Sequence, residues 1–128
     1  MSALALLLAA AAPPMAIVDE RNTLRREAPP HGAIGMSTAW RISDAVPQPR
    51  AMEFRRRTLD KGAAIGLHPI DHDEVYYVLD GEGEVTSDGQ SATLRQGMTA
   101  YLYRGANVGI VQRGRKPLAL IIAYPVPR

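Results

Sequence analysis

Beyond Met52 the chain is a succession of short apolar runs separated by turns that contain glycine. The runs hold about six to nine residues and are rich in Val, Ile, Leu, Tyr and Thr. This spacing is typical of the short strands of an antiparallel sandwich or barrel. No segment after residue 50 has the periodicity of an amphipathic helix. The turns are expected at 60–62, 80–83, 87–89, 96–97, 104–105 and 113–114. The sequence therefore predicts a single all-β domain over residues 51–128.

The 128 residues are enough for one domain with a substantial core and no disulfides. There is no cysteine, which excludes thiol chemistry and cysteine-ligated zinc. Residues 17–50 are charged, and prolines interrupt them at 29, 30, 47 and 49. This composition predicts an extended N-terminal arm with one short strand near residues 37–42. Trp40, the only tryptophan, is expected to pack the arm against the rest of the domain.

The beginning of the chain differs in kind, because residues 4–12 form an unbroken run of Leu and Ala followed by two prolines. A run of roughly ten apolar residues is too short to span a bilayer but fits the apolar part of a signal peptide. Alanines at 10–12 offer a cleavage pattern of small residues, although no Lys or Arg precedes Arg21. We interpret residues 1–16 as a signal peptide, with an ordinary first helix or a disordered tail as alternatives. Export to the periplasm or the exterior would follow, and no other segment is expected to span a membrane.

The charge balance is mildly basic, with a formal net charge of +2 and a pI of about 9.2. Arginines cluster at 25–26 and at 55–57, but aromatic residues make up 5% of the chain and do not interleave with them. Sites for single-stranded nucleic acid combine basic grooves with stacking aromatic side chains. Nucleic acid is therefore not an expected partner.

The arginine run at 55–57 lies on a predicted strand, where successive side chains point to opposite faces. At least one arginine should therefore point inward or into an interface. An inward arginine would indicate a carboxylate or phosphate ligand. Solvent exposure or a salt bridge with Glu53 is the alternative.

A histidine and a carboxylate mark the candidate site. His68 ends one apolar run and Glu74 opens the next, so an antiparallel hairpin would bring them together. Metal sites and proton-transfer sites both use this combination. Tyr76 has the same strand parity as Glu74, and Tyr101 and Tyr103 share one face of a later strand that is expected to be interior. We predict that these five residues line a ligand pocket.

Residues 52–124 resemble a single cupin domain. The first cupin motif has a glycine, His-x-His, a glutamate and a second glycine six residues further on. Here His68 matches the first histidine, Glu74 the glutamate and Gly81 the closing glycine, and residues 97–108 are similar to the second motif. The resemblance implies a jelly-roll-like antiparallel β-barrel that often dimerises through its N-terminal strands, and it implies a divalent metal held by three histidines and one glutamate.

The departures from the family pattern fall on the metal ligands. Ile70 stands at the second histidine position and Val108 at the histidine position of the second motif. His68 and Glu74 alone would hold Mn, Fe, Zn or Ni weakly, since stable sites use three or four protein ligands. His72 would be a third ligand if the hairpin tip folded inward, whereas a solvated turn histidine is the alternative. His31, from the arm of the same or a neighbouring subunit, is a further candidate.

Three functions are compatible with these residues. The preferred hypothesis is an exported domain that binds a small polar molecule in its pocket, without a metal cofactor. The second is a divalent-metal-dependent enzyme of the sugar isomerase, decarboxylase or dioxygenase kind, with His68, Glu74 and His72 as ligands. The third is a homodimeric structural or interaction module whose pocket is filled by its own side chains. An open cavity beside His68 would argue against the third.

Overall fold

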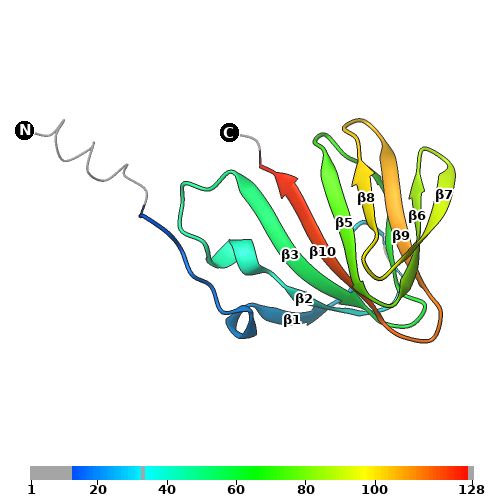
Figure 1. Cartoon of the computed structure of the whole chain (residues 1–128), viewed down its shortest axis with the longest axis horizontal. Coiled ribbons are helices and arrows are strands. Elements are labelled where there is room, and N and C mark those ends of the chain that lie inside the picture. The colour runs from blue at the N-terminus through cyan, green and yellow to red at the C-terminus, as the bar shows by residue number, and fades with distance from the viewer. Residues whose placement is uncertain (1–12, 33, 127–128) are drawn as a thin grey trace, which may run out of the picture.

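The protein is described by a computed structural model covering residues 13–32 and 34–126. Two antiparallel sheets face each other in these residues, and outside the strands the described chain forms turns, loops and two short 3₁₀ helices (Figure 1). The all-β prediction is confirmed. Most of the signal peptide expected over residues 1–16 lies outside the described residues. In the described part of the chain no helix is long and apolar enough to cross a membrane.

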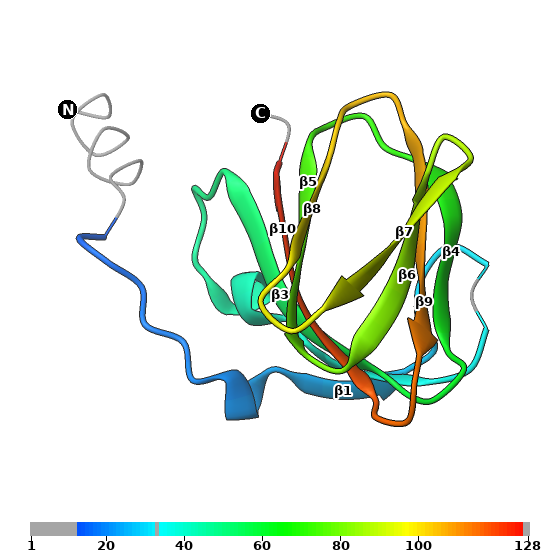
Figure 2. The same cartoon turned by 45° about the vertical axis from the view of Figure 1, so that its right-hand side comes forward.

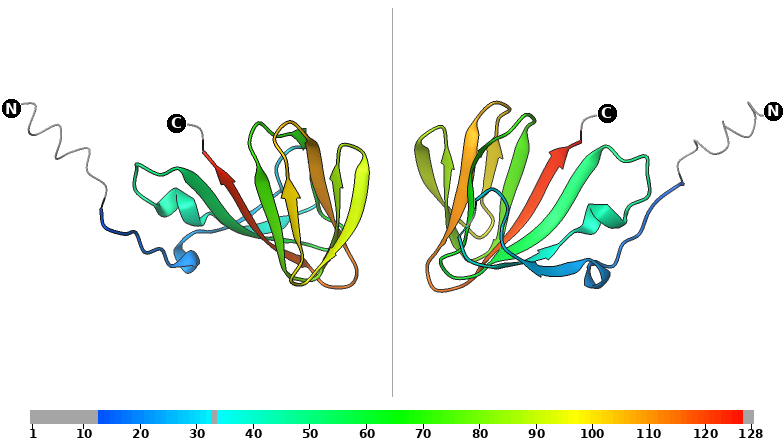
Figure 3. Two further views of the ribbon diagram at one scale, coloured as in Figure 1. Left: turned by 45° about the horizontal axis from the view of Figure 1, so that its top comes forward. Right: turned by 180° about the vertical axis from the view of Figure 1, so that it is seen from behind.

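The larger sheet has six strands, and the smaller has four. In spatial order the larger sheet consists of β1 (Leu24–Glu27), β2 (Ser37–Trp40), β3 (Met52–Leu59), β10 (Leu118–Pro125), β5 (Glu74–Asp80) and β8 (Thr99–Leu102). The smaller sheet consists of β4 (Ala64–Pro69), β9 (Asn107–Arg113), β6 (Glu82–Ser87) and β7 (Gln90–Arg95). From β3 to β10 the chain crosses between the sheets at every connection except the β6–β7 hairpin, which gives the jelly-roll-like arrangement expected from the sequence (Figure 3).

The arm joins the larger sheet. It contains the 3₁₀ helices η1 (Glu20–Asn22) and η2 (Ile42–Ala45) together with β1 and β2. Strand β2 confirms the short strand predicted near residues 37–42, and it pairs with β3. Strand β1 adds an edge strand that the sequence did not reveal. Between β1 and β2 the arm passes beside β4 of the smaller sheet (Figure 2). It therefore contacts both sheets.

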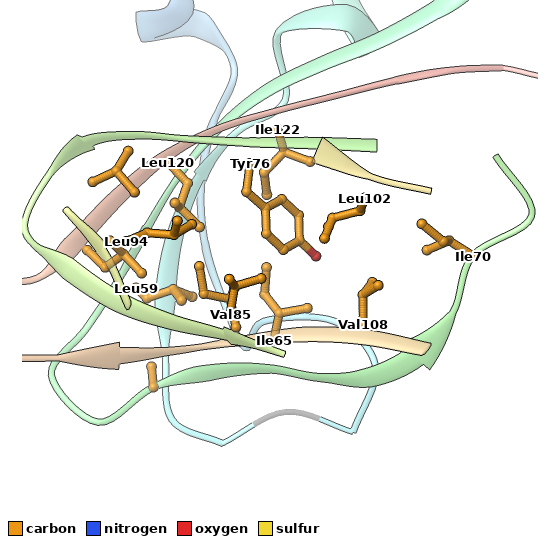
Figure 4. Close-up of a cluster of buried hydrophobic side chains, with 14 of the residues drawn as sticks. Leu59, Ile65, Ile70, Tyr76, Val85, Leu94, Leu102, Val108, Leu120 and Ile122 are labelled. Atoms are coloured by element: carbon orange, nitrogen blue, oxygen red, sulfur yellow. The ribbon is translucent and has the colours of Figure 1, made fainter. Parts of the chain in front are cut away.

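The core lies between the sheets and follows from strand alternation. On β10, Leu118, Leu120 and Ile122 are buried at every second position, and on β5 the buried residues are Glu74, Tyr76 and Val78. The ring of Tyr76 lies among aliphatic side chains from both sheets (Figure 4). Because Glu74 shares the inward face of β5 with core residues, its carboxylate is carried into the space between the sheets.

Candidate functional site

A cavity of about 260 Å³ lies between the two sheets and is lined by β3, β4, β5, β10, the hairpin tip after β4 and the arm. Its apolar wall is shared with the core, while many polar side chains converge on the remainder. These polar residues are His31, Arg55, Arg57, His68, Asp71, His72, Glu74, Tyr76 and Tyr124. All three histidines of the chain therefore line one cavity.

His68 is held by the arm. Its ring stacks on that of His31, with ring centroids 3.6 Å apart and the planes inclined by 10°. His68 Nδ1 lies 2.8 Å from the Gly66 carbonyl oxygen. A carbonyl can only accept, so the proton is on Nδ1 and the Nε2 of the neutral ring is an acceptor. The expected candidate His31 thus comes from the same chain.

The turn that carries His31 has an unusual backbone. His31 has a φ of 67°, a left-handed conformation that is uncommon for residues other than glycine. Such conformations persist where the surrounding structure demands them, and they cluster at functional sites. Burial, and secondarily the neighbouring His68, lower the pKa of His31 below its ordinary value. His31 is therefore a neutral ring at pH 7.

His72 lies over the cavity and not in solvent, because the hairpin tip folds inward. Its ring stacks on Tyr124 with ring centroids 4.4 Å apart and the planes inclined by 7°. His72 Nδ1 is 3.1 Å from the Asp73 carbonyl oxygen, and it lies 3.8 Å from Oε1 of Glu74. The inward position places His72 near Glu74, the carboxylate with which it was predicted to share a site.

Glu74 is the buried acid of the site, with 6% of its surface exposed. Burial raises the pKa of its carboxyl above the ordinary value, while the nearby His72 and His68 rings act in the opposite direction. The Tyr76 hydroxyl lies beside this carboxyl and also acts to lower its pKa, and burial raises the pKa of Tyr76 well above its ordinary value. Glu74 is therefore a carboxyl that keeps its proton to higher pH than an exposed glutamate.

The arginine run on β3 divides between two faces. Arg55 and Arg57 line the cavity, as strand alternation requires, whereas Arg56 lies on the opposite face with its guanidinium 3.5 Å from the centre of the Trp40 ring. The expected inward arginine is thus present twice. The salt bridge to Glu53 also forms, with Arg55 Nη2 3.4 Å from Oε2.

Tyr101 and Tyr103 lie outside the cavity, with exposed fractions of 52% and 70%. The reason is the register of β8, in which Leu102 stands opposite Glu74 and faces inward, so that Tyr101 points to the outer face. The sequence therefore assigned the wrong face of this strand to the interior, because Leu102 and not Tyr101 points into the domain. Of the five predicted pocket residues, the structure brings together His68, Glu74 and Tyr76.

The fold of this site can be compared with those of known proteins. Residues 55–124, more than half of the chain, match the family described as Cupin domain. The chain belongs to the cupin family. The resemblance stated from the two motifs is therefore confirmed. Among proteins with curated descriptions, none matches this cupin.

Solved cupin-like structures share the architecture. A predicted oxalate decarboxylase from Thermotoga maritima is 23% identical with a TM-score of 0.76, and the similarity covers 88% of this chain and 100% of that chain. The polyketide cyclase RemF from Streptomyces resistomycificus is 18% identical with a TM-score of 0.71, covering 89% and 81%. An RmlC-like cupin from Shewanella frigidimarina is 21% identical with a TM-score of 0.63, covering 84% and 87%. Identities this low establish the fold alone.

The metal that cupins commonly hold does not fit the described residues. Val108 stands opposite His68 in the pairing of β4 with β9, where a ligand would be well placed, but it is an aliphatic residue with no exposed surface. Ile70 is likewise buried in the core. Within residues 13–32 and 34–126, no three His, Asp or Glu side chains are arranged to share a metal ion. The absence of a bound metal stays a prediction, which elemental analysis of the purified protein tests.

Glu74→Gln is expected to stabilise the protein at pH 7–8 by about 1 kcal/mol. Because the folded pKa of Glu74 lies above its unfolded value, ionisation is penalised in the fold. That penalty is absent below the unfolded pKa and grows as the pH rises through the folded pKa. Urea unfolding from pH 4 to 8 should show a gain that disappears toward pH 4. Glu84, which is half-buried and pairs with Arg113 at 3.2 Å, is replaced by Gln as the control, and an equal gain there would contradict this account.

Proposed function

We propose that this cupin binds a small polar molecule in the cavity through its side chains, without a metal cofactor. The observation that carries the proposal is the convergence of all three histidines and Glu74 on one cavity. Polar groups that converge in a largely apolar pocket are typical of ligand sites. The volume of about 260 Å³ is below the usual range of roughly 300–1,000 Å³ for drug-sized ligands, so it suits a small molecule.

The polar groups supply complementary hydrogen-bonding roles. Nε2 of His68, whose Nδ1 faces the Gly66 carbonyl, can accept a hydrogen bond, and the Glu74 carboxyl, whose pKa burial raises, can donate one when it holds its proton. A hydroxyl group of a ligand, which donates and accepts, would satisfy both. His68 is held in orientation by the Gly66 carbonyl and by the stacked His31 ring. Such fixed orientation favours binding because less rotamer freedom is lost when a ligand arrives.

The cavity also bears on the alternative functions. A structural module with a filled pocket would have no space beside His68, and the cavity there favours the binding function. The similar structures described as a predicted oxalate decarboxylase and a polyketide cyclase have names that refer to small organic molecules. At these identities the similarity establishes the fold, and it carries neither ligand nor activity over to this protein. A metal-dependent enzyme would need ligands beyond His68 and Glu74.

His68→Ala is expected to weaken binding of the best small polar probe by about tenfold, which corresponds to the loss of one hydrogen bond in a buried site. The probes are D-glucose, L-serine, L-lactate and L-lactamide, measured by calorimetry on the purified protein. His68→Phe keeps a ring against His31 but removes both nitrogens, so it should lose affinity as well. Thr93→Ala on the exposed face of β7 is the control and should bind as the original protein does.

Two results would count against the proposal. Unchanged affinity in both His68 variants would mean that the ligand does not contact this histidine. Elemental analysis that finds a full equivalent of Mn, Fe, Zn or Ni, lost in His68→Ala, would instead favour the metal-dependent enzyme.

A further inference from the structure

Arg55 and Arg57 bring positive charge to the cavity wall. This charge plays no part in the binding of a polar group by His68 and Glu74. Arg57 has 5% of its surface exposed. Burying a guanidinium is costly unless the charge is paired and its donors are satisfied. The contacts of these two side chains therefore indicate what the cavity can accept.

Arg57 is incompletely neutralised. Its Nη1 donates to Ser37 Oγ at 2.8 Å, and its Nη2 lies 3.9 Å from a carboxylate oxygen of Glu27. Arg41 holds that same carboxylate by two hydrogen bonds, at 3.0 and 2.7 Å. The charge of Glu27 is thus matched by Arg41, and burial lowers the pKa of Arg57 below its ordinary value. About one positive charge in the cavity wall is left without a close partner.

The Arg55 guanidinium is largely neutralised, but one of its nitrogens has no hydrogen-bond partner in the described residues. Its Nη2 contacts Asp44 at 3.2 Å and Glu53 at 3.4 Å, so its charge is largely matched. Its Nε, however, is buried and has no hydrogen-bond partner within the described ranges. A buried donor without a partner is destabilising. Because this Nε has almost no accessible surface, a ligand in the cavity does not reach it, and Arg57 alone carries the unmatched charge.

The other charged groups of the cavity leave this positive charge in place. Glu74 has a raised pKa, which reduces its negative charge, and Asp71 stands at the rim with its side chain largely in solvent. His31 is neutral at pH 7. One uncompensated positive charge matches a ligand with one negative charge, because the other arginine of the described cavity lining, Arg55, is already paired with Asp44 and Glu53.

We propose that the ligand is a small monoanionic carboxylate that also carries a hydroxyl group. Its carboxylate would lie against Arg57, and its hydroxyl group against His68 and Glu74. This inference rests on the proposed function, since it names the class of molecule that the same cavity takes. A planar guanidinium matches a carboxylate well, through two parallel hydrogen bonds.

The test compares L-lactate with L-lactamide, which has the same shape but no charge. Calorimetry on the full chain should give at least about tenfold tighter binding of L-lactate, because a charged hydrogen-bonded pair is lost with the amide. Arg57→Met should remove most of this preference. Arg56→Met is the matched control, since Arg56 lies on the same strand but faces Trp40, and it should keep the preference. Inorganic phosphate should compete more weakly than L-lactate.

The outcomes separate this inference from the proposed function. Equal binding of L-lactate and L-lactamide, or a preference kept in Arg57→Met, overturns the anion inference alone. Binding of D-glucose that depends on His68, without binding of L-lactate, does the same and leaves the proposed function standing. Tighter binding of phosphate than of L-lactate would overturn the inference of a monoanionic carboxylate and would indicate a dianionic ligand instead. No binding of any probe by the folded protein would overturn both. The comparison of the two probes needs no variant, so it holds even if Arg57→Met fails to fold.

Discussion

Replacement of Gly81 by alanine is expected to lower the free energy of unfolding by about 3 kcal/mol or more. Gly81 joins β5 to β6, where the chain passes from the larger to the smaller sheet, and its φ is 85°. Left-handed backbone costs a residue with a side chain roughly 1–2 kcal/mol. A Cβ here would also overlap the carbonyl oxygen of Pro117, a backbone atom just before β10. Overpacking of this kind adds about 1–3 kcal/mol.

Gly89→Ala separates the two contributions. Gly89 has a φ of 79°, and a Cβ added to it meets no atom within 4 Å. Its replacement should therefore cost only the conformational part, about 1–2 kcal/mol. Urea unfolding of both variants measures the difference. Equal losses would mean that the turn between β5 and β6 is not packed against β10 as described.

Gly66→Ala is expected to move the arm off β4 and to weaken binding of L-lactate by at least about tenfold. Gly66 has no left-handed backbone, so alanine is conformationally acceptable there. A Cβ at this position, however, would overlap the backbone carbonyl oxygen of His31. The turn would have to shift, and the His31 ring would leave His68. The cavity would then lose part of its wall without the loss of any polar side chain.

The displacement can be measured directly. The Ile34 amide donates to the Ala64 carbonyl oxygen at 3.4 Å, so its hydrogen exchange should become faster in Gly66→Ala. His31→Ala is the comparison, because it removes the ring and leaves the backbone contact in place. It should keep the Ile34 protection. Unchanged exchange and unchanged L-lactate affinity in Gly66→Ala would show that the arm does not close the cavity.

The turns were the most predictable part of the fold. Each of the six predicted turns contains a glycine with positive φ: Gly62, Gly81, Gly89, Gly97, Gly105 and Gly114. Glycine adopts this conformation at little cost, so the requirement of the turn is visible in the residue itself. The inward parity of β5 was also predictable, because Tyr76 and Val78 alternate with less buried neighbours and carry Glu74 with them.

The candidate site was predictable only where it depended on one hairpin. His68 and Glu74 flank a single short connection, so both were assigned to the cavity from the sequence. Which face of β8 points inward could not be predicted from the sequence, since Tyr101 and Leu102 are both compatible with a core. Only the pairing of β8 with β5 decides between them. For the arginines at 55–57 the sequence favoured solvent exposure or a salt bridge over an inward position, and His31 was only a secondary candidate for the site.

The sequence by itself determined an all-β cupin domain, the positions of its turns and the absence of the usual metal ligands at positions 70 and 108. These properties depend on residue type and on periodicities of a few residues. The tertiary structure alone decided that His31 stacks on His68, that Arg57 and not Arg56 faces the cavity, and that His72 folds inward. Contacts between segments far apart in the chain depend on sheet pairing and packing, which no local pattern contains.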